Sequence, residues 1–145
     1  MTLHFKIDCN PPKSTHQGSM RIMKRHDGTR FVGKFHDSKG RQTMDMLLTL
    51  LAPHRPAQAM EGPLTLTVLW SYPWRKTEKK AYLSQGFRPC DTYPDCDNLA
   101  KMLCDAMTKL AFWHDDGQVS SLCIQKEWSA KPGITITVGD MMGMP

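Results

Sequence analysis

Long apolar runs are missing from this sequence of 145 residues. No stretch approaches the roughly 18 to 20 consecutive apolar residues that a helix needs to span a bilayer. The opening residues, MTLHFKIDCNPPKS, also lack the apolar segment behind a basic head that marks a secretory signal. From these absences we expect neither a helical membrane protein nor a secreted one, and the expected location is the cytoplasm.

Paired cysteine motifs are missing as well. The chain has five cysteines, an odd number, and no Cys-x-x-Cys pair. Such a set favours neither a disulfide framework nor a zinc ribbon. We therefore expect reduced, scattered thiols at Cys9, Cys90, Cys96, Cys104 and Cys123.

Acidic residues are also fewer than basic ones, and the formal net charge is +5. Residues 1–41 carry nine Lys/Arg against three Asp/Glu, whereas residues 42–145 carry ten against eleven. A basic segment next to an acidic cluster suggests a polyanion that is held close to a cation site. The alternative is a basic surface that is only solvated.

The hydrophobic pattern predicts one α+β domain, a small mixed β-sheet with two main helices packed on it. Forty per cent hydrophobic residues is enough for one core. The helix over 98–110 has the clearest apolar stripe, with a spacing of three and four residues. The expected strands are 3–8, 63–72, 118–128 and 133–140, the helices 41–54 and 98–110, the basic loops 13–41 and 73–89, and the flexible tail 141–145. Within the first basic loop, residues 29–36 could form a short strand or an ordered loop.

Two pairs of aspartates flank the helix over 98–110. Asp95 and Asp97 precede it, and if this segment is extended their side chains point the same way. Lys101 follows Asp97 by about one helical turn and shares the polar side of the helix with Cys104.

The second pair, Asp115 and Asp116, follows the helix just before a strand. A helix that returns to its sheet can carry Asp116 back toward Asp95 and Asp97. Converging carboxylates repel one another unless a cation lies between them, and Mg²⁺ prefers oxygen ligands. Each residue also has a plainer interpretation: Asp97 as a helix cap, the second pair as turn residues, and Lys101 as a surface ion-pair partner.

The combination of these residues is more specific than any of them alone. The segment PDCDNLAKMLCDAMTKLAFWHDDGQV, residues 94–119, resembles the signature of the RusA family of Holliday junction resolvases. That pattern is Asp-x-Asp-Asn-Leu-x-Lys, an amphipathic helix, an aromatic pair and Asp-Asp-x-Gln-Val, and no gap is needed to match it. The matching residues are Asp95, Asp97, Asn98, Leu99, Lys101, Asp105, Ala106, Phe112, Trp113, Asp115, Asp116, Gln118 and Val119. Two departures are Cys96, where an apolar residue is usual, and a long basic stretch over 73–91.

The resemblance implies a function. Asp95, Asp97 and Asp116 match the family's metal-binding aspartates, and Lys101 matches its important lysine, whereas the role of Asp115 is open. It also implies a homodimer, a need for Mg²⁺ with Mn²⁺ as a substitute, and paired nicks across a four-way DNA junction during recombination and repair. Such proteins are commonly encoded by phages and prophages, which agrees with a cytoplasmic location in a bacterial host.

The basic segments are the expected DNA-binding surface, because Lys and Arg neutralise backbone phosphates. Three other functions stay open: a branched-DNA-binding module without catalysis, a nuclease for flaps or forks, and a hydrolase of small phosphorylated molecules. The residues expected to contact DNA are Lys13, Arg21, Lys24, Arg25, Arg75 and Lys76.

Overall fold

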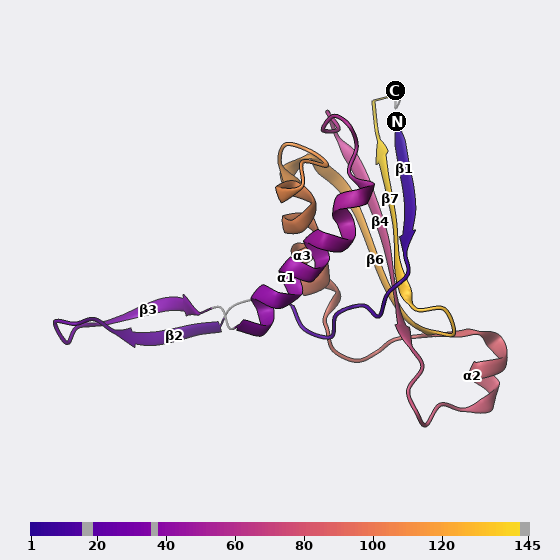
Figure 1. Cartoon of the computed structure of the whole chain (residues 1–145), viewed down its shortest axis with the longest axis horizontal. Coiled ribbons are helices and arrows are strands. Elements are labelled where there is room, and N and C mark those ends of the chain that lie inside the picture. The colour runs from indigo at the N-terminus through magenta and orange to yellow at the C-terminus, as the bar shows by residue number, and fades with distance from the viewer. Residues whose placement is uncertain (16–18, 36–37, 143–145) are drawn as a thin grey trace.

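A twisted mixed sheet forms the body of the molecule (Figure 1). The computed structural model describes residues 1–15, 19–35 and 38–142, and within them this sheet has five strands. Strands β4 and β6 run parallel, and the other pairs are antiparallel. In order across the sheet, the strands are β1 (Thr2–Ile7), β7 (Gly133–Asp140), β4 (Leu64–Pro73), β6 (Val119–Ser129) and β5 (Phe87–Pro89).

Two helices, α1 (Ser38–Leu51) and α3 (Cys96–Lys109), cover one face of this sheet (Figure 1). A 3-10 turn, η1 (Ala52–His54), continues α1. The alternation of β4 places Leu66, Val68 and Trp70 toward the helices, where all three are buried. The opposite face of the sheet is rich in threonine, as that alternation requires.

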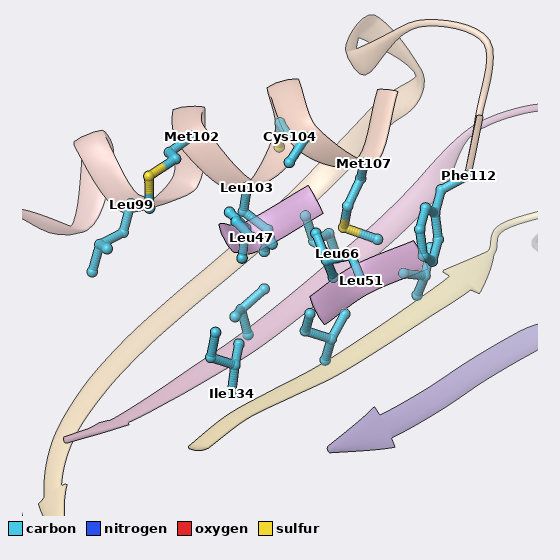
Figure 2. Packing of buried hydrophobic residues seen from close by; sticks show 14 of the residues in the cluster. Leu47, Leu51, Leu66, Leu99, Met102, Leu103, Cys104, Met107, Phe112 and Ile134 are labelled. Carbon is cyan, nitrogen blue, oxygen red and sulfur yellow. The ribbon is translucent and has the colours of Figure 1, made fainter. Parts of the chain in front are cut away.

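The apolar stripe of α3 is the centre of the core. Figure 2 shows it facing Leu47 and Leu51 of α1, with Leu66 and Ile134 of the sheet beneath. Because the stripe is buried along the whole helix, α3 is fixed in rotation and in height above the sheet. Its buried members are Leu99, Ala100, Met102, Leu103, Cys104, Ala106 and Met107.

The prediction of a basic loop over 13–41 was wrong except at residues 29–36, where the alternative of a short strand fits β3 (Arg30–Phe35). Strands β2 (Ser19–Lys24) and β3 form an antiparallel hairpin, and α1 already begins at Ser38. The hairpin projects away from the sheet as an arm (Figure 1). Its turn contains Gly28 with a φ of 88°, a left-handed conformation that suits glycine. Strand β2 and the pairing of the two strands were not predicted, because the arm buries no apolar face.

The second predicted loop, 73–89, also contains regular structure. A short helix, α2 (Lys80–Gln85), ends at Gly86, whose φ is 90°, and leads into β5. Glu78 accepts two hydrogen bonds from Arg88, at 3.1 and 3.2 Å, which holds the loop before α2 against β5. These hydrogen bonds lower the pKa of Glu78. Neither α2 nor β5 has a periodic apolar pattern, which is why sequence reasoning missed them.

The remaining elements agree with the predictions. The strands expected over 3–8, 63–72, 118–128 and 133–140 are β1, β4, β6 and β7, and the predicted helices are α1 with η1 and α3. The α+β class with a mixed sheet is confirmed. Of the tail predicted over 141–145, residues 143–145 lie outside the described part. None of the helices in the described part is long and apolar enough to cross a membrane.

Replacement of a stripe residue tests the core. We expect Leu103→Ala to lower the free energy of unfolding by about 2–5 kcal/mol, because Leu103 is fully buried between α3 and the sheet. The matched control is Lys109→Ala on the exposed side of the same helix, with an expected change within about 0.5 kcal/mol. Urea unfolding followed by circular dichroism measures both, and equal midpoints for the two variants would contradict this packing.

Candidate functional site

Two aspartates lie at the N-terminal end of α3. Asp95 is the N-cap residue, with φ −72° and ψ 146°, and its side chain makes no capping hydrogen bond. Asp97 lies inside the first turn, where a negative charge is favourable to the helix dipole. The condition under which Asp95 and Asp97 would point the same way, an extended segment over 95–97, is not met, because the helix begins at Cys96. Both carboxylates are exposed to solvent.

The segment in front of Asp95 is held by a lysine that sequence reasoning missed. Lys126 of β6 donates hydrogen bonds from Nζ to the carbonyl oxygens of Thr92 (2.6 Å) and Pro94 (2.7 Å). Such bonds from a charged donor are stronger than neutral ones. Lys126 therefore fixes where the chain enters α3 and where Asp95 lies.

A signal for Lys126 exists in the sequence of β6. Val119 and Ile124 of this strand pack against the core, whereas Cys123 is exposed. The register with β4 pairs Lys126 with Trp70 and Trp128 with Tyr72, so Lys126 occupies a position of the helix-facing row. A lysine in such a row must find acceptors, and it finds them in the backbone ahead of Asp95.

Lys101 lies on α3 one turn beyond Asp97 and is exposed. In the part of the chain that the structure describes, its ammonium makes no hydrogen bond or ion pair, and neither do the carboxylates of Asp95, Asp97 and Asp116. The interpretation of Lys101 as an ion-pair partner of Asp97 is thus not supported. These four side chains are free to bind a ligand.

The second aspartate pair lies beyond the other end of α3, and its members differ in role. Asp115 caps the 3-10 turn η2 (Asp116–Gln118), because its Oδ1 accepts a hydrogen bond of 2.7 Å from the Gly117 amide. Gln118 completes this capping box by accepting from the amides of His114 and Asp115. Asp115, whose role the sequence left open, therefore has a structural role as the cap of η2.

Asp116 lies beside the middle of α3, near Cys104. Burial raises the pKa of Cys104 to about 11, and the charges of Asp116 and Asp105 add to this shift. Cys104 is buried, so the prediction that it shares the outward side with Lys101 was wrong. The turn after α3 has carried Asp116 back along the helix, but only part of the way to Asp97.

One chain does not bring the three aspartates together. Cys104 follows Asp95 by nine residues, which corresponds to a rise of about 13 Å along a helix. Across residues 1–15, 19–35 and 38–142, no three His, Cys, Asp or Glu side chains are grouped closely enough to hold a metal ion. The oxygen donors suit a hard divalent cation, yet each end of α3 presents only part of a ligand set.

Comparison with known proteins identifies the family of this chain. The family model for the endodeoxyribonuclease RusA matches residues 11–139. The chain belongs to the RusA family. The match includes both aspartate pairs and the helix between them, and it also includes the hairpin arm.

Two relatives cover nearly the whole length of this RusA-family chain. An uncharacterized protein of Bacillus subtilis (strain 168), YqaN, is 27% identical over 143 residues, which is 93% of this chain and 99% of that protein. A crossover junction endodeoxyribonuclease, rusA, of Lactococcus phage r1t is 27% identical over 139 residues, which is 94% of this chain and 95% of the relative. Membership of this family supports the assignment of the chain as an endonuclease.

The cations expected to contact DNA are all exposed, but they lie on different parts of this RusA-family fold. Arg21 lies over the ring of Phe35 (4.2 Å) and Arg25 over that of Phe31 (4.9 Å), so the arm orients both guanidinium groups. Lys24, Arg30 and Lys34 lie on the same arm and are exposed as well. Lys13, Arg75 and Lys76 lie near the far end of β4.

The role of Lys126 is testable by an uncharged side chain of similar length. We expect Lys126→Met to lower the free energy of unfolding by about 1–3 kcal/mol, because two backbone carbonyls lose a charged donor. Lys131→Met, on an exposed lysine after the same strand, is the control and should change little. Thermal unfolding measures both, and an unchanged Lys126→Met protein would exclude this role.

Proposed function

We propose that this protein is a Mg²⁺-dependent, structure-selective endonuclease that resolves four-way DNA junctions by paired symmetric nicks. One observation carries the proposal: four exposed side chains make no hydrogen bond or ion pair within the described chain, and they lie in the part matched to the RusA family. They are those of Asp95, Asp97, Lys101 and Asp116. Exposed carboxylates at a basic protein's surface are well suited to a cation that a polyanion also contacts.

The aspartates are the proposed metal ligands, and Mn²⁺ is expected to substitute for Mg²⁺. A bound divalent cation supplies Lewis-acid stabilisation of the charge on a phosphodiester. Lys101 lies beside Asp97 on the exposed side of α3 and is proposed to stabilise negative charge on the phosphate in the transition state. Because each end of α3 holds only part of the ligand set, we propose that a second copy of the chain completes it.

An open sheet edge supports this homodimer. Strand β5 pairs with β6 only at residues 127–129, so over residues 120–125 the outer edge of β6 faces no other described strand. Residues 120–123 are exposed, and Leu122 keeps 48% of its surface in contact with solvent. An open edge with an exposed leucine is a ready template for a further strand.

Antiparallel pairing of two β6 edges would unite the two half-sites. In such a pair the beginning of one β6 lies beside the end of the other. Asp116 precedes the beginning of β6, whereas Lys126, near its end, holds the segment in front of Asp95. Asp116 of one copy would thus approach Asp95 and Asp97 of the other, which gives two equivalent sites related by a two-fold axis.

A two-fold pair of sites suits a four-way junction, which has nearly two-fold symmetry itself. The hairpin arms would contact the backbone, since residues 19–35 carry five Lys/Arg against one Asp. A two-stranded ribbon also fits the major groove of DNA. Binding should then weaken steeply with salt, and junction shape should matter more than base sequence.

A branched-DNA-binding module without catalysis is the second candidate, and it would explain the arm but not the unpaired carboxylates. A nuclease for flaps or forks would use the same site, and competition between branched substrates would distinguish it. A hydrolase of small phosphorylated molecules is disfavoured, because the aspartates lie on an exposed surface rather than in an enclosed pocket.

The catalytic assignment is tested by two isosteric variants. We expect Asp95→Asn and Asp116→Asn each to abolish cleavage of a labelled four-way junction in Mg²⁺, because each removes an anionic oxygen ligand. Junction affinity in a gel-shift assay with a chelator should stay within about twofold of wild type, because the basic arm is unchanged. Full cleavage by either variant would contradict the assignment.

Mixing the two inactive variants tests whether two copies share each site. In a mixed dimer, one site combines both substitutions, and the other combines an intact Asp95 with an intact Asp116. We therefore expect the mixture to recover nicking of a single strand without paired cuts. If each site belonged to one chain, the mixture would stay inactive, and two portions of the same variant provide that baseline.

A charge on the open edge tests the dimer itself. We expect Leu122→Glu to convert the dimer into a monomer in light scattering at micromolar concentration, because two like charges would meet beside the axis. Leu83→Glu on α2 introduces the same charge at a comparably exposed leucine (45%) away from β6 and should leave the mass unchanged. A wild-type monomer, with or without junction DNA, would refute the model.

A further inference from the structure

A small aromatic pocket lies next to the candidate site. It has a volume of about 260 Å³ and opens between the end of β4, the segment before α3 and the residues that follow β1. This volume is below the roughly 300–1,000 Å³ of pockets for cofactors and drug-sized ligands. It suits a single flat ring system. The side chains that form it include Tyr72, Trp74, Trp128 and Tyr93, with Lys13 and Arg75 at the rim.

The wall of the pocket is built rather than accidental. The rings of Tyr72 and Trp128 lie 6.1 Å apart at 59°, and the Tyr72 hydroxyl donates a hydrogen bond of 2.9 Å to the carbonyl oxygen of Pro12. Trp128 is 9% exposed, and its Nε1 has no hydrogen-bond partner within the described chain. The fully buried Trp70 has an unpartnered Nε1 as well, so it is the position of the Trp128 ring, and not its N–H group, that shapes the pocket.

The rim of the pocket is positively charged. Arg75 lies over the ring of Trp128 at 5.2 Å and its Nε also pairs with Glu78 at 3.6 Å, while both Arg75 and Lys13 are exposed. A flat ring between aromatic side chains, with cations at the mouth, is the arrangement that binds a base together with its phosphates.

The position of the pocket ties it to the candidate site. Tyr93 and Cys90 of its wall belong to the segment that ends at Asp95, and Lys126 fastens this same segment to β6. A base in the pocket would therefore hold the neighbouring part of its strand beside Asp95.

We propose that this pocket receives one unstacked nucleobase of the bound DNA strand, next to the phosphate that is cut. Trp74 and the other aromatic rings contact the base, and Lys13 and Arg75 contact the adjoining phosphates. The proposal rests on the proposed DNA-cleaving function and gives it a base-contacting subsite. Unstacking is easiest at a branch point, so the pocket would add selectivity for junctions.

A scan with abasic nucleotides tests the pocket without relying on a protein variant. Four-way junctions carry one abasic residue at successive positions around the branch point, and wild-type affinity is measured in a chelator. We expect a loss of at least about fivefold at one position of each cut strand, since one base–aromatic stack has about that effect. A flat profile would overturn the proposal.

Protein variants complete a thermodynamic cycle. Trp74→Ala should weaken binding of the intact junction by a similar factor and abolish the difference between intact and abasic junctions, whereas Trp74→Phe should retain most of both. Phe87→Ala, at an exposed aromatic residue outside the pocket, is the matched control. A Trp74→Ala protein that is folded by circular dichroism and still discriminates would exclude Trp74 as the contact.

Tryptophan fluorescence separates this proposal from the proposed function. Trp70 and Trp113 are fully buried, so quenching by a single-stranded oligonucleotide would report on Trp74 and Trp128. Quenching that disappears in Trp74→Ala supports the pocket even if no junction is cut. Normal junction cleavage with no quenching and a flat abasic profile would refute the pocket alone. Equal affinity for thymidine monophosphate and for the oligonucleotide would overturn the assignment to a DNA strand.

Discussion

The packing of α3 on the parallel strands β4 and β6 is the contact on which the rest of the molecule depends. Its stripe meets Leu47 and Leu51 on one side and Leu66 on the other, so the helix has one allowed height and rotation (Figure 2). Asp95 and Asp97 lie at the start of this helix, and the turn that follows the helix brings Asp116 near Cys104, so the position of the helix sets where both aspartate pairs lie. The stability of the core and the geometry of the candidate site therefore both depend on how this one helix packs.

Electrostatics gives a physical reason for dividing the ligand set. Three carboxylates within one folded chain would repel one another whenever the cation is absent. With Asp97 at the start of α3 and Asp116 beside its middle, the described fold contains no such cluster. In the dimer that we propose, repulsion would arise only at the interface, where a cation and DNA can offset it.

The sequence predicted the periodic parts of this fold well. The four main strands and both long helices follow from apolar spacing, because burial of one face leaves a record in the sequence. The arm, α2 and β5 leave no such record, since their order comes from turns at Gly28 and Gly86 and from polar contacts such as that of Glu78. Contacts between residues far apart in the sequence could not be predicted either, such as the hydrogen bond from Lys126 to Thr92, which are 34 positions apart. Sequence identified the aspartates as chemical groups but could not place them relative to one another.

The hairpin arm has a consequence for how such a protein can change over time. Residues 19–35 contribute nothing to the hydrophobic core, and the arm stands apart from the sheet (Figure 1). Substitutions at Met20, Ile22 or Val32, which are 63–73% exposed, would therefore leave the folding of the body intact. A substitution there changes only the surface of the arm, whereas a substitution in the apolar stripe of α3 also disturbs the segments that carry the aspartates. The part of the molecule that can vary without loss of stability is therefore separate from the part that sets the candidate site.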